Sequence, residues 1–226
     1  MKAPHQMGRS LRSSAFTRLE LAITVLLVVL VALLALSMRK AVQRHADPVE
    51  CGDNLKHVGL ALLTWANDHN DMFPTLVSTN LGGSQEYVGT SKAFRHLLPL
   101  TNQLGTPTKL VCPADSRIAS RDWLSLTNAN ISYFISLDAE VREGGMLLLG
   151  DRHLEGKPSK VGSLLVLNTK SSFGWGPANH GEKFGNLVLV DGSVHGVYTS
   201  EFYAPELTRF VQKSLTGTVS NRLEFP

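Results

Sequence analysis

The sequence predicts an α+β protein in which a long N-terminal transmembrane and stem helix packs on an antiparallel β-sheet. Residues 19–38 form an apolar run of about twenty residues, the length of a helix that crosses a bilayer. Residues 53–70 then repeat apolar side chains every three or four positions, as an amphipathic helix does. Short β-type runs dominate beyond Pro99, and Asp191-Gly192 separates two of them as in a tight hairpin.

A basic segment precedes the apolar run. The first fifteen residues hold three basic and no acidic side chains, which favours a cytoplasmic location for this end, although three more basic residues follow the run. The basic residues are Lys2, Arg9 and Arg12 before the run, and Arg39, Lys40 and Arg44 after it. Without the first fifteen residues, the 22 Lys and Arg fall to 19, equal to the 19 Asp and Glu. No basic surface for nucleic acid is therefore expected.

Glu20 lies at the start of the apolar run. A carboxylate near the start of a membrane-spanning helix costs a few kcal/mol unless it finds a partner. If the chain were cut between Ala15 and Phe16, the new α-amine would lie one helical turn before Glu20. The carboxylate of one copy could then pair with the amine of the next, which indicates a role for Glu20 in assembly.

The first helix is expected to continue through residues 39–46 and to break or kink at Asp47-Pro48, because proline lacks the amide hydrogen that a helix interior uses. With a bend there, it would continue into the amphipathic stem. Asp53 is the predicted N-cap of a second helix. Its predicted buried face consists of Leu55, Val58, Leu62, Trp65 and Ala66.

A polar cluster at residues 67–71, followed by Pro74, ends this second helix. The cluster favours a solvated turn over a cation site, because it lacks the alternating oxygen ligands of a calcium loop. Residues 75–90 are predicted as a loop and 91–100 as a short helix. Strands are predicted at 109–112, 131–137, 146–150 and 163–167, a hairpin at 185–198, and a helix at about 200–214.

Cys51 and Cys112 are the two cysteines of the chain. They are widely separated, and in an exported domain such a pair can form a disulfide, but the sequence does not give their distance in space. Neither belongs to a CxxC motif, so a zinc site is not expected.

The stretch AFTRLEL with its apolar continuation resembles the class III prepilin signal of type IV pilins and type II secretion pseudopilins. The resemblance implies that a prepilin peptidase cuts between Ala15 and Phe16 and methylates the new amine, and it places Glu20 at the fifth mature position. Two residues depart from the pattern. Ala15 stands where the family usually has glycine, and Arg18 stands where it has an apolar residue. The alternative is an uncleaved signal anchor.

Four further blocks are similar to a branch of bacterial pseudopilin-like proteins; they are residues 51–74, 110–115, 131–135 and 180–195. That branch carries a histidine, a spacer of about nine residues, and then Asp-Gly. Here ten residues separate His180 from Asp191-Gly192. The resemblance implies a pilin-like fold.

The domain organisation that follows is a leader at 1–15, a transmembrane and assembly helix at 16–46, and an extracytoplasmic domain at 47–226. The implied function is a structural subunit of a type II secretion or pilus-like filament, anchored by a single pass in the inner membrane. The implied partners are prepilin peptidase, other pilin or pseudopilin subunits, membrane lipid, and an inner-membrane secretion platform with its cytoplasmic ATPase. The alternative is a membrane-anchored module that never polymerises and binds a ligand through loops 75–90 or 171–180.

A catalytic or metal site is conceivable if His153, His180, Asp191 and His195 converge. A structural role is favoured, because a tight hairpin itself requires Asp191 and Gly192. The chain shows no nucleophile elbow, Walker loop or HExxH motif. The sequence therefore predicts no enzyme activity, no cofactor and no metal.

Overall fold

The structure is a computed structural model that describes residues 17–157, 163–167, 172–176, 180, 184–198 and 221–226, with the side chains of 35–47 and of a few strand positions excepted. The chain divides into two compact units, residues 1–43 and 44–226, which are described separately below. The predicted leader at 1–15 and the predicted helix at about 200–214 lie outside the described residues.

Helix α1 spans Arg18–Asn67 and begins with a capping box. The amide of Glu20 donates to the Thr17 hydroxyl at 3.2 Å, while the Glu20 carboxylate accepts from the Thr17 amide at 2.9 Å and from its hydroxyl at 3.0 Å. This reciprocal pattern satisfies backbone donors that the first turn leaves unpaired. The predicted break at Asp47-Pro48 is wrong, because α1 continues through Pro48, and Asp53 therefore caps no new helix.

The predicted membrane anchor is also contradicted. Within the part of the chain that the structure describes, no helix is both long and apolar enough to cross a membrane. The predicted pilin-like fold class, with its long transmembrane stem helix, is therefore wrong. The predicted single-pass location in the inner membrane is wrong for the same reason. The folded domain is instead characterised by a mostly antiparallel six-stranded sheet and a series of short helices.

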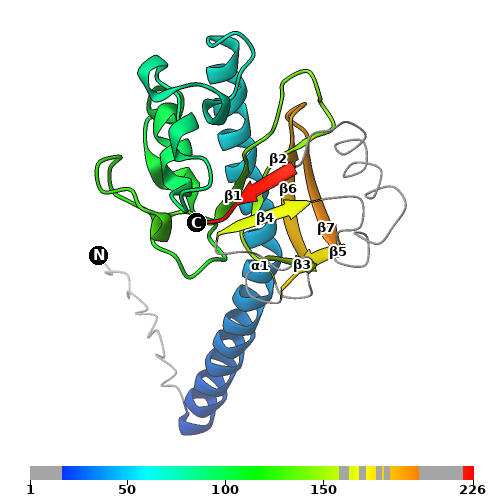
Figure 1. Cartoon of the computed structure of the whole chain (residues 1–226). Helices are drawn as coiled ribbons and strands as arrows, with labels where there is room; N and C mark the ends of the chain where they lie inside the picture. The colour runs from blue at the N-terminus through cyan, green and yellow to red at the C-terminus, as the bar shows by residue number, and fades with distance from the viewer. Residues whose placement is uncertain (1–16, 158–162, 168–171, 177–179, 181–183, 199–220) are drawn as a thin grey trace, which may run out of the picture. The chain divides into compact units, whose positions relative to one another are not determined.

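The six-stranded sheet has the strand order β4-β8-β1-β2-β6-β7, and each described neighbouring pair is antiparallel (Figure 1). A separate two-stranded sheet pairs β3 with β5. The strands are β1 Tyr133–Ser136, β2 Leu147–Asp151, β3 Leu154–Lys157, β4 Leu164–Leu167, β5 Ser172–Trp175, β6 Phe184–Leu189, β7 Val194–Tyr198 and β8 Asn221–Glu224.

The predicted strands at 131–137, 146–150 and 163–167 correspond to β1, β2 and β4, and the predicted hairpin is β6–β7. The predicted strand at 109–112 is wrong, because Pro107 opens a 3-10 turn that extends to Leu110. Strands β3, β5 and β8 were not predicted.

The C-terminal part of α1 covers one face of the six-stranded sheet. All five residues of the predicted apolar face are buried there, which confirms that face. Gly59 allows close packing, because a Cβ at this position would lie 2.8 Å from a methyl carbon of Val188 in β6. Leu154 and Trp175 of the small sheet belong to a second cluster with β6 residues such as Leu187. The core therefore has two parts, one under α1 and one under the β3–β5 sheet.

The segment between α1 and β1 consists of short helical turns, which the sequence only partly predicted. Asn70 and Asp71 adopt positive φ angles of 56° and 59°, and the Asp71 amide donates to the carbonyl of Ala66, so this polar cluster forms the turn that ends α1. The turns that follow are η1 Pro74–Leu76, η2 Thr79–Leu81, η3 Gln85–Tyr87, η4 Ala93–His96, η5 Leu98–Leu100, α2 Thr101–Leu104, η6 Pro107–Leu110 and η7 Asn128–Asn130. The predicted loop at 75–90 and helix at 91–100 are thus both series of 3-10 turns.

Candidate functional site

A buried disulfide joins Cys51 of α1 to Cys112, which follows η6. The two Cα atoms are 4.8 Å apart across 61 residues of sequence, and both residues are fully buried. Closing a loop of this length stabilises the fold by about 4 kcal/mol in the chain-entropy treatment. The bridge therefore fixes the irregular segment to the helix that covers the sheet.

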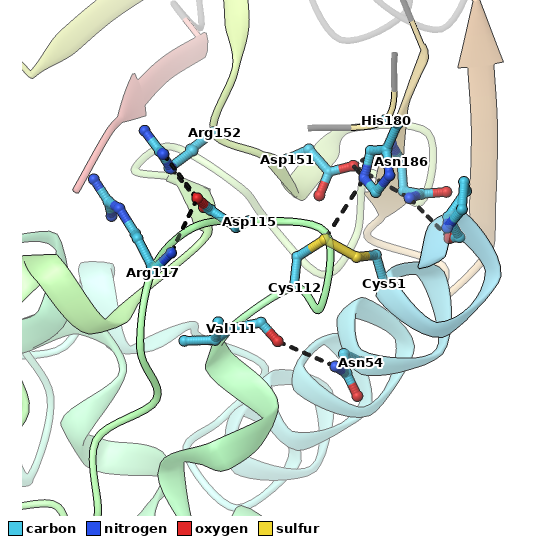
Figure 2. Close-up of a disulfide and its surroundings, with 11 residues drawn as sticks. Cys51, Asn54, Val111, Cys112, Asp115, Arg117, Asp151, Arg152, His180 and Asn186 are labelled. Carbon is cyan, nitrogen blue, oxygen red and sulfur yellow. Dashed lines mark hydrogen bonds and ion pairs between the residues drawn. A yellow bond between two sulfur atoms is a disulfide. The ribbon is translucent and has the colours of Figure 1, made fainter. Parts of the chain in front are cut away.

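His180 lies directly against this disulfide (Figure 2). Its Nε2 atom is 3.7 Å from Cys112 Sγ and 3.1 Å from Oδ2 of Asp151 at the end of β2. Only 1% of each side chain of the His180–Asp151 pair is exposed. The result is a dry site in which a carboxylate, an imidazole and a sulfur pair are in contact.

Asn186 of β6 completes the surroundings of Asp151. Its backbone amide and its side-chain amide donate to Oδ2 of Asp151 at 2.7 and 3.2 Å. The same side-chain amide lies 3.2 Å from the carbonyl oxygen of Pro48 in α1. The cluster therefore joins helix α1, strands β2 and β6, and His180. The Asp151 carboxylate is stabilised by the neutral amide donors of Asn186 as well as by the imidazole.

This geometry differs from that of a nucleophile–base–orienter triad. In a triad the two ring nitrogens of histidine face different partners, one the nucleophile and the other the orienting acid. Here Cys112 and Asp151 both face Nε2 of His180, and the sulfur of Cys112 is bonded to Cys51. Cys51, Cys112 and His180 nevertheless bring ligand atoms together, because one atom of each lies within 4.8 Å of the others.

Charged groups flank the cluster on the side of β1 and β2. Burial, and next the charge of Asp151, raise the pKa of Tyr133 well above its ordinary value. Asp115 is paired with Arg152 through two contacts of 2.6 and 2.8 Å. Burial opposes ionisation of Asp115, but the Arg152 guanidinium outweighs it and the pKa of Asp115 falls to about 2. Arg117 donates to three backbone carbonyls, those of Asn128, Ile131 and Pro226.

A second buried pair lies on the other side of β1, where His96 of η4 is 3.5 Å from Glu224 of β8. Neither side chain is exposed. Ser84 contacts the other ring nitrogen of His96 at 2.8 Å, and the amide of Gly89 donates to Glu224 at 3.1 Å. These contacts attach the C-terminal strand to the irregular segment, which is a structural role.

The structure places His180 and Asp191 in separate environments. The extended strand β6 lies between them, so the two ends of the motif face different neighbours. Oδ1 of Asp191 accepts from the amide and hydroxyl of Ser193 at 2.8 and 2.6 Å, and Gly192 has φ of +82°. Asp191-Gly192 therefore shapes the β6–β7 turn, while His180 anchors the start of the strand.

Two of the other candidate residues are brought together, because Asp191 and His195 both contact the Ser193 hydroxyl. His195 of β7 contacts the Ser193 hydroxyl at 2.9 Å, and His153 acts electrostatically on Asp115. Ala15 and Phe16 lie outside the described residues. Glu20 lies in the other compact unit, where it caps α1.

Asp151 and Asn186 were missed by the sequence analysis. Both are polar residues beside or inside apolar strand runs, LLLGD in β2 and FGNLVL in β6. A polar side chain at a position that a strand buries requires a hydrogen-bond partner, so this interruption was the available signal. Comparison with known proteins gives no match to any family, curated protein or solved structure.

Proposed function

We propose that this chain is a pseudopilin-like structural subunit of a type II secretion or pilus-like filament, cut by prepilin peptidase before Phe16. The observation that carries the proposal is the exposed apolar surface of α1 between Leu19 and Leu34. Its large apolar side chains are 48–71% exposed, with Leu19 the most exposed and Ile23 the least. A helix that is apolar on every side is normally covered by other apolar groups.

Burial of this surface supplies the driving force for assembly. Covering one exposed Leu, Val or Ile side chain stabilises a complex by about 1.5–3 kcal/mol before the loss of conformational and association entropy is subtracted. Twelve such side chains are exposed between Leu19 and Leu34, namely Leu19, Leu21, Ile23, Val25, Leu26, Leu27, Val28, Val29, Leu30, Val31, Leu33 and Leu34. Packing the same segment of several copies together would cover most of it.

Glu20 would set how far neighbouring copies of α1 are shifted along their axes. The capping box holds the Glu20 carboxylate at the first turn of α1, next to the amide of Thr17. Thr17 is the second residue after the proposed cleavage site. An amine created at Phe16 of a neighbouring copy would be a complementary charge for this carboxylate. The partners of the proposal are the peptidase, further subunits, and a secretion platform driven by an ATPase.

The capping box also provides a sharp test. Glutamine at the third helical position supports a capping box as glutamate does, but it carries no charge. Glu20→Gln therefore keeps the cap and removes the ion pair, whereas Glu20→Ala removes both. Wild type and both variants are expressed with a prepilin peptidase, and assembly is measured as the chain recovered in sheared filaments.

We expect both variants to lose assembly at least tenfold, with intact mass showing a methylated Phe16 as the first residue of wild type. Recovery of assembly in Glu20→Gln alone would assign Glu20 to helix capping and refute the charge pair. A wild-type chain that keeps residues 1–15 and never sediments with filaments would contradict the proposed function as a whole.

A further inference from the structure

Three ligand atoms, one each from Cys51, Cys112 and His180, lie within 4.8 Å of one another beside the disulfide, close enough to share one metal ion. With metal–nitrogen and metal–oxygen bonds of about 2.05 Å and metal–sulfur bonds of about 2.3 Å, a tetrahedral ion separates nitrogen from sulfur by about 3.6 Å and nitrogen from oxygen by about 3.3 Å. In this site Nε2 of His180 is 3.7 Å from Cys112 Sγ and 3.1 Å from Asp151 Oδ2. Both separations from Nε2 of His180 are therefore close to tetrahedral values, whereas the two bonded sulfurs would have to separate on reduction.

The donor set is the one that zinc prefers. Two sulfurs, one imidazole and one carboxylate are typical zinc ligands. The two thiolates by themselves balance the charge of a divalent ion, and the carboxylate leaves the centre with one net negative charge. Oδ1 of Asp151 has no hydrogen-bond partner among the described residues, so this buried carboxylate has unused capacity for a ligand. Asn186 already donates hydrogen bonds to the carboxylate and orients it, as the hydrogen-bond partners of metal ligands do.

The disulfide and a metal are alternative occupants of the same space. Cysteines are synthesised as thiols, and forming the bridge removes two electrons and two protons, which a disulfide oxidant accepts. Metal binding to the thiols releases the same two protons to water and transfers no electrons. Because Cys51 and Cys112 are fully buried, the choice between the two is made during folding, before the site closes.

We propose that the reduced chain binds one Zn²⁺ ion through Cys51, Cys112, His180 and Asp151. The metal takes Nε2 of His180, so the neutral imidazole carries its proton on Nδ1. The carboxylate of Asp151, whose Oδ1 has no hydrogen-bond partner among the described residues, supplies the fourth ligand. The site thus has two covalently distinct states, an oxidised one closed by the disulfide and a reduced one closed by the ion. This inference does not depend on the proposed role in a filament.

Cobalt is the probe for this site, because thiolate-bound Co²⁺ has a near-ultraviolet charge-transfer band. The full chain is unfolded, reduced with a phosphine, and refolded without oxygen in a non-ionic detergent while Co²⁺ is titrated. We expect the band to saturate at one equivalent and to disappear when Zn²⁺ is added. Absence of the band at stoichiometric Co²⁺ would overturn the proposal.

Two variants of His180 separate coordination from a structural role. His180→Gln should weaken Co²⁺ binding at least tenfold. His180→Cys replaces the imidazole by a thiolate, which also binds Co²⁺, and should retain binding with a stronger charge-transfer band. A merely structural role would not produce this result. The matched control is His57→Gln. His57 is an exposed α1 residue with a hydrogen bond of 2.7 Å to the carbonyl of Asp53, so this variant should bind Co²⁺ as wild type does. Equal Co²⁺ affinity in wild type and His180→Gln would exclude His180 as a ligand.

Discussion

The two ends of helix α1 carry similar apolar residues but meet different surroundings. Between Leu19 and Leu34 the large apolar side chains are about half exposed or more, whereas Leu55, Val58 and Leu62 are completely buried. The second region finds its cover inside the same chain, on the six-stranded sheet. The first region has no cover among the described residues of its own unit. The comparison shows that apolar content alone does not tell whether a helix stabilises a fold or an assembly.

The largest effect should come from the covalent link that fixes the covered region. Replacing both Cys51 and Cys112 by alanine is expected to lower the free energy of unfolding by about 4 kcal/mol, because the unfolded chain regains the entropy of a 61-residue loop. Urea unfolding of the purified protein under oxidising conditions measures this loss. An unchanged midpoint would mean that packing against the sheet holds the irregular segment without the bridge.

A matched pair of leucine substitutions sharpens the comparison directly. Leu62→Ala leaves a cavity between α1 and the sheet and should destabilise the domain by about 2–5 kcal/mol. Leu26→Ala removes the same atoms from a side chain that is 66% exposed and should leave domain unfolding unchanged while reducing filament recovery. Thermal unfolding and the shearing assay are measured on both variants. Equal destabilisation by the two would contradict the division of α1 into a covered and an exposed region.

The smallest effect is a pH dependence of the covered region. The folded-state pKa of Asp115, about 2, lies below its ordinary value of 3.8. A carboxylate with a depressed folded pKa stabilises the fold above its unfolded pKa, and this stabilisation is lost as the pH falls from about 4 to about 2. The loss corresponds to about 2 kcal/mol.

Asp115→Asn is the matched control for this titration. The variant keeps a polar side chain of similar size, so its stability should be lower at neutral pH and should fall less between pH 4 and pH 2. Urea midpoints measured at half-unit pH steps give both curves. Parallel curves for wild type and variant would show that the pair with Arg152 does not depress the pKa of Asp115.

Local sequence patterns predicted the parts of the fold in which neighbours along the chain decide the outcome. The buried face of α1 followed from helical spacing, and the β6–β7 turn followed from Asp191-Gly192, whose geometry depends on a few adjacent residues. Strand β8 escaped prediction because NRLE has no strand pattern of its own, and pairing with β1 and β4 creates it. The break predicted at Pro48 failed because a helix tolerates a single missing hydrogen bond when its neighbours continue.

By itself, the sequence determined the apolar helix face, five of the described strands of the large sheet, the hairpin turn, and the residues of an apolar N-terminal run. Only the tertiary structure decided that Cys51 meets Cys112, that His180 meets Asp151 rather than Asp191, and that His96 meets Glu224. The physical reason is distance along the chain. Periodicity reports which side of an element is apolar, but contacts between residues 29 to 128 positions apart depend on how several elements pack at once.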